Sequence, residues 1–457
     1  MTKPDCDVAI LGAGLAGAAA ACICSDHGLS TVVLEARDRV GGRGFTRNFA
    51  GTADALEFGG SWIAPWHDRI RRYAERTGIT LRPTHPVIEH RWHDGEMLRK
   101  VLPPPDLALQ AVKEHALLYK AGKPFPWTGP LTLNQYLERI KADPETRAHV
   151  LAWWTISGNG DPAYISASEF LSSCAYGDGS PESMMTALRH TLVPGVGVLA
   201  ERMITSSKAR LELNAPVASV SQNSNGVTVT CMNGTMVKAR AAICAMPLNA
   251  LRFVEFTPEL SAKKREAIVL GHGGRSLKLW LKVKGVDPGM LASGGPGGLR
   301  WLFSERTASD GATLIVGFAL ADGTLDPTDR LSVTASLARF FPEAQLVAWD
   351  WHDWLGDPYA RGTWVALPAD APWIGDPEIW SREGRIAFAA SDFAENDAGW
   401  FEGAIRSGRL PHWRCDPRHK CRPRDLNRSF AGSNKKPRHR LWRDPQESPS
   451  KYCFELC

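Results

Sequence analysis

Three closely spaced glycines and one distant acid are the residues whose spacing points most directly to chemistry. Gly12, Gly14 and Gly17 follow a short apolar run. Glu35 ends a second apolar run. In a βαβ unit, the first glycine permits a tight turn, the second lets the backbone approach a pyrophosphate, and the third lets the helix pack closely on the strand. The helix N-terminus supplies amide donors for the phosphates, and the acid accepts hydrogen bonds from ribose hydroxyl groups. The pattern therefore predicts a dinucleotide site, and an acid at position 35 argues against NADP.

The elements that must position these residues can be read around them. Residues 7–11 form a short run that is apolar after Asp7, as in a buried parallel strand. Residues 18–24 are alanine-rich and favour a helix, and residues 30–34 are the second run, apolar towards its end. Strand, glycine turn, helix, strand and acid occur in order, whereas the glycines alone would be weak evidence. The apolar stretch 8–24 contains all three glycines and is too short for a bilayer, so no membrane segment is predicted.

Two further segments resemble the flavin amine oxidases of bacterial type, the family related to monoamine oxidases, polyamine oxidases and L-amino-acid oxidases. Residues 35–43 resemble the segment that follows the ribose acid in that family, and residues 54–63 resemble its glycine pair near the flavin ring. The resemblance extends from about residue 5 to residue 408. It implies an α/β, two-domain fold, with an FAD-binding domain of the Rossmann-like GR2 type and an interleaved α+β substrate domain. The implied FAD-binding segments are 4–81, 195–255 and 383–408, and the substrate domain comprises 82–194 and 256–382.

The same resemblance implies FAD held without a covalent bond. Relatives with covalent flavin carry a cysteine before the first of two aromatic residues, whereas Thr363 stands there in this chain. Residues 385–392 and 396–408 resemble the third FAD segment of the family, in which the acid meets the ribityl chain and a helix start points amides at the flavin ring. The one departure is Ala390, where the family has glycine. The residues expected to bind FAD are Gly12, Gly14, Gly17, Glu35, Ala36, Arg37, Gly42, Arg43, Gly59, Gly60, Ser61, Trp62, Val217, Asp392, Gly399, Trp400 and Phe401.

Three residues are expected to act on the substrate. Residues 276–283 alternate as a strand, and by that alternation alone Lys278 is a solvent-facing lysine. The resemblance changes this interpretation, because many amine oxidases hold a lysine on this strand that bonds through water to flavin N5 and assists the reaction with oxygen. Trp364 and Trp400 stand where the family places two aromatic residues in front of the flavin. Such rings attract a cationic amine.

The activity implied by the resemblance is oxidation of an amine C–H bond by hydride transfer to flavin N5. The imine is then hydrolysed to a carbonyl compound, and oxygen is reduced to hydrogen peroxide. An L-amino-acid oxidase and an amine dehydrogenase with another electron acceptor are alternatives with the same fold. An amino-acid substrate would need a cationic partner for its carboxylate, and spacing assigns no arginine to that task. A catalytically impaired FAD-binding protein is the alternative from another class.

From Arg409 the sequence departs from the family's pattern. Residues 409–457 hold 13 basic and 5 acidic residues, so the +5 net charge of the 457-residue chain belongs to this tail, and the body carries −3. A shifted reading frame, a disordered basic extension, and a metal site from Cys415, His419 and Cys421 are the three interpretations. The last lacks standard zinc spacing, so no metal is predicted. A shifted frame would shorten the helix that begins near Trp400 and impair flavin retention.

Composition bounds the remaining expectations. Hydrophobic content of 44% and charged content of 23% are ordinary for a globular chain, and 457 residues favour two domains. The expected partners are a small amine and oxygen, with neither nucleic acid nor membrane, and dimers are common among relatives. Residues 1–7 lack the features of a signal peptide, and the cysteines show no disulfide framework. The sequence therefore predicts a cytoplasmic protein with buried thiols.

Overall fold

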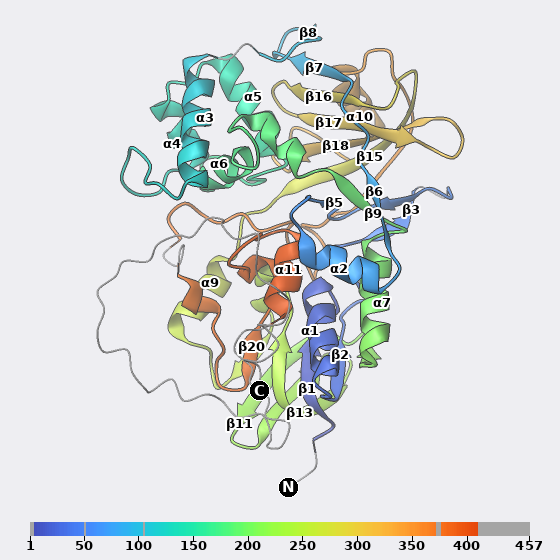
Figure 1. Cartoon of the computed structure of the whole chain (residues 1–457), viewed down its shortest axis with the longest axis vertical. Helices are drawn as coiled ribbons and strands as arrows, with labels where there is room; N and C mark the ends of the chain where they lie inside the picture. The colour runs from blue at the N-terminus through green and yellow to red at the C-terminus, as the bar shows by residue number, and fades with distance from the viewer. Residues whose placement is uncertain (1–3, 50–51, 104–105, 372–375, 410–457) are drawn as a thin grey trace.

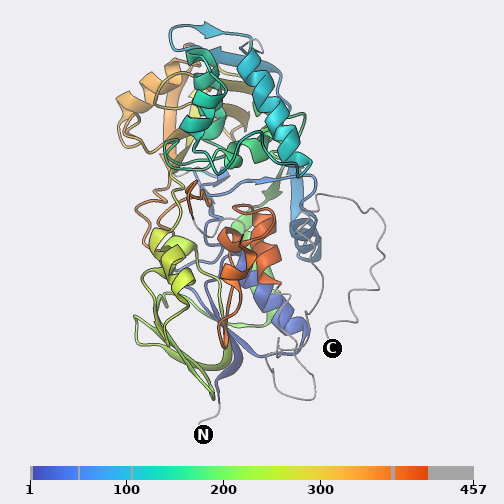
Figure 2. The same cartoon turned by 90° about the vertical axis from the view of Figure 1, so that its left-hand side faces the viewer.

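The computed structural model describes residues 4–49, 52–103, 106–371 and 376–409, which form two lobes stacked along the long axis of the molecule (Figure 1). The lower lobe in this view contains the N-terminal strands, and the upper lobe contains the helices of the middle of the chain. The view turned by 90° shows the same two lobes (Figure 2). The tail predicted to be atypical, residues 409–457, lies outside the described residues except for Arg409.

The lower lobe is built on an eight-stranded sheet to which three separated parts of the chain contribute. Strand β1 pairs in parallel with β2 and with β13, and β20 adds in parallel to β13. Strand β12 pairs in antiparallel fashion with β11 on one side and with β13 on the other. The strands are β1 (Cys6–Leu11), β2 (Thr31–Leu34), β10 (Arg210–Glu212), β11 (Val217–Asn223), β12 (Gly226–Cys231), β13 (Met236–Cys244), β14 (Glu255–Thr257) and β20 (Ile386–Phe388).

One face of this sheet is covered by the helix that follows the first glycine turn and by the helices packed against it. Helix α1 (Leu15–Asp26) is alanine-rich and almost entirely buried, because α7 (Val196–Ser207) and α11 (Phe401–Gly408) pack against it. Ala16, Ala404 and Ile405 share one apolar core. Through this contact the helix that begins after Trp400 packs on the first βαβ unit. The lobe's other helices are α2 (Asp68–Arg76), α8 (Leu248–Leu251), α9 (Ala262–Leu270) and the short 3₁₀ segments Pro377–Trp380 and Ser391–Phe393.

The upper lobe is built on a seven-stranded sheet in the order β19-β15-β18-β17-β16-β7-β8. Strand β15, the second in this order, carries Lys278, and residues 276–283 are all buried. The solvent-facing interpretation of Lys278 from alternation alone is therefore wrong, because a helical layer covers one face of the sheet and α10 (Arg330–Ala338) the other. The strands are β7 (Glu89–His93), β8 (Leu98–Arg99), β15 (Ser276–Lys284), β16 (Met290–Gly294), β17 (Trp301–Thr307), β18 (Thr313–Leu320) and β19 (Gln345–Trp351).

The helices that cover one face of the upper sheet, here called the helical layer, begin at residues that cap helix N-termini. The side chains of Asp106, Thr132 and Asp143 cap three of its helices, and Thr132 does so in a capping box with Gln135. The layer comprises α3 (Leu107–Lys120), α4 (Leu133–Arg139), α5 (Pro144–Trp154), α6 (Ser168–Cys174) and the 3₁₀ segment Pro181–Thr186.

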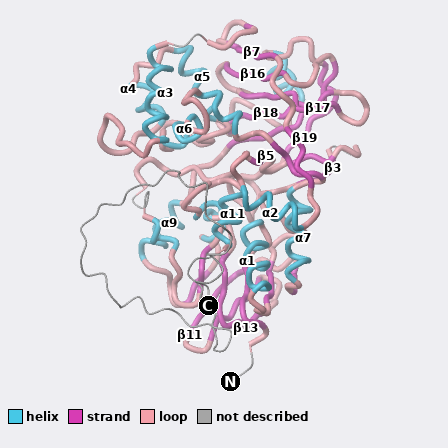
Figure 3. The backbone as a smooth tube through the Cα atoms, viewed as in Figure 1, coloured by secondary structure: helices cyan, strands magenta, loops and turns pink. Residues whose placement is uncertain are grey.

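Two small sheets lie where the lobes meet (Figure 3). The first pairs β3 (Thr46–Asn48) with β4 (Ala55–Glu57). The second has β9 (His190–Val193) between β5 (Trp62–Ile63) and β6 (Thr80–Pro83). They bring residues 57–62 of the first segment against the upper sheet. The six cysteines among the described residues are free and buried, as predicted. None of the described helices has the length and apolar character that a membrane span requires.

Candidate functional site

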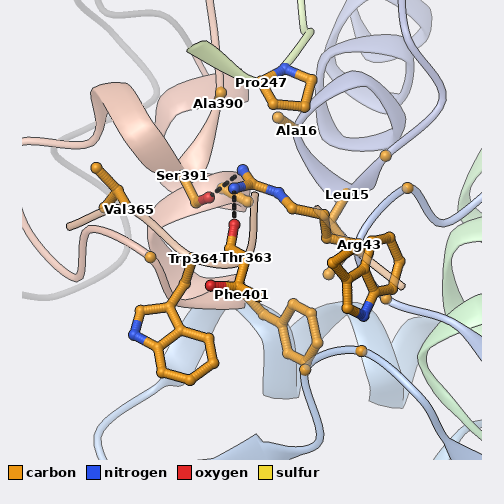
Figure 4. Close-up of a pocket in the computed structure, with 18 of the residues that line it drawn as sticks. Leu15, Ala16, Arg43, Pro247, Thr363, Trp364, Val365, Ala390, Ser391 and Phe401 are labelled. Carbon is orange, nitrogen blue, oxygen red and sulfur yellow. Dashed lines mark hydrogen bonds between the residues drawn. The ribbon is translucent and has the colours of Figure 1, made fainter. Parts of the chain in front are cut away.

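A cavity of about 480 Å³ reaches from the first glycine turn into the space between α6 and β15. Its walls come from both lobes, and part of them is shown in Figure 4. Every residue expected to bind FAD or act on the substrate lines this cavity, except Gly17 and Asp392. The structure therefore brings together residues from position 12 to position 401 that the sequence placed in separate motifs.

In the glycine turn, the fold requires a glycine at position 17 but not at position 14. A Cβ atom on Gly17 would lie 1.9 Å from the Gly12 carbonyl oxygen, so helix and strand can approach only without a side chain. Gly14 is extended, with φ −69° and ψ 178°, a conformation open to any residue. A Cβ atom there would meet only the Gly42 Cα atom, at 3.9 Å. The protein itself thus leaves open space at Gly14, at the start of helix α1, which fits the phosphates of FAD.

Glu35 is held rigidly at the cavity wall. Its carboxylate accepts hydrogen bonds from the backbone amides of Ala13, at 2.8 Å, and Arg37, at 3.0 Å. Arg37 in turn pairs with Asp357 at 2.5 Å. Ala36 and Val217 line the cavity beside this carboxylate. The arrangement suits an adenosine ribose, because the carboxylate keeps lone pairs free for two hydroxyl groups.

Arg43 links three parts of the chain beneath the cavity. Its guanidinium donates to the Thr363 carbonyl at 2.6 Å and to Ser391 Oγ at 2.9 Å (Figure 4). It also pairs with the buried carboxylate of Asp392 at 2.5 Å. Burial alone would raise the pKa of Asp392, but the charge of Arg43 lowers it below its ordinary value. Asp392 therefore stays ionised and supports Arg43 from behind the cavity wall.

Removal of this buried carboxylate is expected to destabilise the fold. The variant Asp392→Ala leaves the Arg43 charge without its partner and the Leu248 amide without its acceptor, which costs about 3–5 kcal/mol for a buried pair. Urea denaturation of the FAD-free protein would measure the loss. As a control, Glu259→Ala removes an exposed pair with Arg265 and should cost less than about 1 kcal/mol. Equal costs for the two variants would refute the role assigned to Asp392.

Lys278 points from β15 towards the residues of the glycine-pair segment. Its ammonium donates to the carbonyl oxygens of Glu57, at 2.7 Å, and Gly59, at 2.8 Å, and to the hydroxyl of Ser61. Burial lowers the pKa of Lys278, against the opposing charges of Glu57 and Glu305. Burial likewise raises the pKa of Glu57, whose carboxylate accepts from the Val196 amide at 2.7 Å. Lysine and acid thus form one buried electrostatic unit beside the cavity.

The two tryptophans are fixed by hydrogen bonds on their indole nitrogens. Trp364 Nε1 donates to the Ser157 carbonyl at 3.0 Å, and Trp400 Nε1 donates to the Tyr176 hydroxyl at 3.1 Å. The ring of His67 lies edge-on to Trp400, with centroids 5.1 Å apart. Both indole rings line the cavity. Because their polar edges are satisfied, the aromatic faces remain available to a ligand.

Several residues of the site escaped the sequence analysis. Glu57 lies inside the segment that carried the resemblance, but only its glycines drew attention. Glu169 and Tyr176 belong to the helical layer, where no motif was recognised. The charge of Glu305 acts on Lys278 from β17, which is separated from β15 by β18, so only the strand order of the sheet reveals it. Only Glu57 could have been noticed in the sequence, because its carboxylate stands two residues before the predicted glycine pair Gly59-Gly60.

Comparison with known proteins gives consistent matches. A family model described as flavin containing amine oxidoreductase matches residues 13–410. A pseudooxynicotine dehydrogenase from Pseudomonas sp is 28% identical, over 89% of this chain and 85% of that protein. An (S)-6-hydroxynicotine oxidase from Paenarthrobacter nicotinovorans is 28% identical, over 88% of this chain and 97% of that protein. Among solved structures, putrescine oxidase bound to putrescine has a TM-score of 0.77 at 24% identity, over 88% of this chain and 97% of that chain. At this identity the structural likeness shows the shared fold.

Proposed function

Because this chain belongs to the flavin-containing amine oxidoreductase family, we propose that it oxidises the C–H bond beside an amine nitrogen and passes the electrons to oxygen. The observation that carries the proposal is one continuous cavity with the glycine turn at one end, and with Lys278, Trp364 and Trp400 on its walls. The expected products are an imine, which water hydrolyses to a carbonyl compound, and hydrogen peroxide.

FAD is the cofactor of this family, and when bound it accepts a hydride from the substrate carbon and passes electrons to the acceptor. We propose that the segments 4–81, 195–255 and 383–408 hold it, since they share the eight-stranded sheet, with 82–194 and 256–382 forming the substrate domain. The cavity-lining residues from Gly12 to Phe401 named above are the proposed contacts. Thr363 supports a non-covalent site, because its hydroxyl donates to Asn159 Oδ1 at 2.6 Å and has no thiol chemistry to offer.

Trp364 and Trp400 are proposed to orient the substrate amine. Their π faces attract an arriving ammonium, and their low-dielectric surroundings favour the neutral amine, the form with a lone pair to assist the oxidation. No described side chain needs to act as a base on the C–H bond itself, because the cofactor accepts both the proton and its electrons as a hydride.

Oxygen as the acceptor is supported by Lys278. A buried ammonium beside the cavity stabilises negative charge that builds up as oxygen is reduced. Of the two curated relatives described above, one is named an oxidase and the other a dehydrogenase, so another electron acceptor is the second candidate.

An L-amino-acid oxidase is less well supported, since Arg43 is already bonded to Asp392, Ser391 and Thr363. The buried free thiols favour a reducing cytoplasm.

The proposed reaction is tested by anaerobic titration of the purified, yellow protein with a panel of primary, secondary and cyclic amines. At least one amine should bleach the flavin absorbance, and admission of air should restore it with release of hydrogen peroxide. Bleaching that air does not reverse within minutes would indicate a dehydrogenase. A protein that carries flavin but is bleached by no amine would overturn the proposal.

Removal of the Trp364 ring should weaken binding of the amine substrate while the protein stays folded. Trp364→Ala is expected to raise KM by roughly fivefold to thirtyfold, because a desolvated cation–π contact contributes about 1–2 kcal/mol. Trp364→Phe keeps an aromatic face and should recover most of the loss. Steady-state oxygen consumption with the best amine of the panel would measure both. An unchanged KM in Trp364→Ala would remove this residue from the substrate site.

A further inference from the structure

Four cationic side chains line the cavity, those of Arg37, Arg43, Lys278 and Arg361. The guanidinium groups of Arg37 and Arg43 each pair with an aspartate at 2.5 Å. The ammonium of Lys278 lies in the field of two buried glutamates. Arg361 differs from these three, because it forms no ion pair with any residue that the structure describes. Its charge is therefore the one on the cavity wall that no described carboxylate neutralises.

The guanidinium of Arg361 lies at the end of the cavity that contains the glycine turn. Its Cζ atom is 4.0 Å from the centroid of the Phe253 ring, and both residues line the cavity. Phe253 follows helix α8, and Met246 precedes that helix. Met246 borders the glycine turn, since a Cβ atom on Gly12 would lie 3.7 Å from Met246 Cγ. One turn of helix therefore connects the glycine turn with the ring beneath the guanidinium.

We infer that Arg361 binds the pyrophosphate of FAD and supplies positive charge that the paired cations of the cavity wall do not. The inference rests on the function proposed above, from which the identity of the cofactor comes. Two phosphates carry two negative charges, and a helix N-terminus such as that of α1 offsets about half of one. A guanidinium offers parallel N–H donors that match two phosphate oxygens. An unpaired arginine at this end of the cavity thus fits the charge that remains.

The backbone of Arg361 is held in a conformation that costs energy. Its φ of +51° lies in the left-handed region, which favours glycine. Two hydrogen bonds fix it there: the Arg361 amide donates to the Asp357 carbonyl at 2.9 Å, and the Arg361 carbonyl accepts from Asn249 Nδ2 at 2.8 Å. Glycine would fit this backbone with less strain, so an arginine here points to a role for its side chain.

Arg361 and Trp364 are three residues apart but face different ends of the cavity. Trp364 Nε1 donates to the Ser157 carbonyl, and its ring centroid is 6.4 Å from that of Phe318, so Trp364 packs against the upper lobe. Arg361 lies over Phe253, which stands between α8 and β14 of the lower lobe. The arginine therefore serves the cofactor end of the cavity and does not supply the partner that a substrate carboxylate would need.

Binding of ADP to the FAD-free protein, measured by titration calorimetry at low and at high salt, tests this contact. ADP carries the adenosine and the two phosphates of the cofactor. Arg361→Met should lower the affinity for ADP by a factor of about 10 at low salt, the lower end of the range for a charged hydrogen bond, because Arg361 is exposed. At high salt the loss should shrink to about twofold, since screening weakens the charge in the wild type.

The holoenzyme provides a second measurement. On dilution, Arg361→Met should release FAD about tenfold faster than the wild type, as followed by flavin fluorescence. Arg361→Lys keeps the charge and should recover part of both losses. Arg361→Gly should weaken ADP binding as much as Arg361→Met does, yet raise the melting temperature of the FAD-free protein, because it relieves the strained backbone. This variant keeps the test decisive if Arg361→Met folds poorly.

Arg252→Met is the matched control. The Cζ atom of Arg252 lies 5.5 Å from the centroid of the same Phe253 ring, but Arg252 does not line the cavity. Its substitution removes an exposed positive charge from the same neighbourhood and should leave ADP affinity and FAD release unchanged. An equal loss in Arg252→Met would show that the general surface charge matters and would refute a contact by Arg361.

The outcomes separate this inference from the proposed function. If the wild-type protein binds neither FAD nor ADP, the flavoenzyme function itself fails. If the wild type binds FAD, and Arg361→Met binds ADP and retains FAD as well as the wild type does, the function stands and the role of Arg361 is refuted. A loss of ADP affinity that is the same at low and at high salt would also refute it, because it would indicate an uncharged contact.

Discussion

Lys278→Met is expected to slow the reaction of the reduced enzyme with oxygen by about a hundredfold, the effect of removing one preorganised charged donor from a buried site. Reduction of the enzyme by its amine should change far less, because the lysine donates to Glu57, Gly59 and Ser61 and not to the tryptophans that orient the amine. Stopped-flow mixing of the anaerobically reduced enzyme with oxygenated buffer measures the first rate, and anaerobic mixing with amine measures the second.

The same strand provides the control for this experiment. Lys282 lies four residues further along β15 on the same face, is equally buried, and pairs with Asp310 at 2.6 Å, away from the cavity. Lys282→Met therefore removes a buried ammonium of the same sheet without touching the cavity, and its oxygen reaction should match the wild type. If Lys278→Met reoxidises as fast as Lys282→Met, the lysine has no part in the oxygen reaction.

Lys278 also shows where sequence reasoning stops. The alternation of residues 276–283 correctly predicted a strand, but alternation assigns polar residues to solvent only when one face of a sheet is open. Here both faces are covered, so every residue from Ser276 to Val283 is buried. Which layers cover a sheet depends on contacts between distant segments, and these leave no local pattern. The family resemblance supplied the functional interpretation that periodicity could not.

The glycine and acid motifs were predictable because their chemistry is local. A turn that needs glycine, a helix start that offers amides and an acid at a strand end each depend on a few consecutive residues. Glu169 and Tyr176 had no such signature, since their position depends on a helical layer that folds over a sheet whose strands β15 to β19 begin about a hundred residues further along the chain. Glu57 stood within a recognised segment, yet its importance arises from Lys278 on another lobe.

A second large effect is expected at Gly14. Gly14→Val should leave the FAD-free protein folded, because the backbone there is extended and the nearest atom to an added Cβ is the Gly42 Cα atom at 3.9 Å. FAD affinity should nevertheless fall by a factor of about 100 or more, equivalent to about 2.7 kcal/mol. The new side chain occupies the space between the helix start and the phosphates that it is proposed to bind.

Gly17→Ala is the matched variant for the opposite outcome. Its Cβ would lie 1.9 Å from the Gly12 carbonyl oxygen, so strand β1 and helix α1 would have to separate, and both the fold and FAD binding should be lost together. Circular dichroism and thermal denaturation of the FAD-free proteins report the fold, and titration with FAD, followed by flavin fluorescence, reports affinity. Wild-type affinity in Gly14→Val would show that the cofactor's phosphates do not lie at this turn. Unfolding of Gly14→Val would show instead that the glycine serves the fold, as Gly17 does.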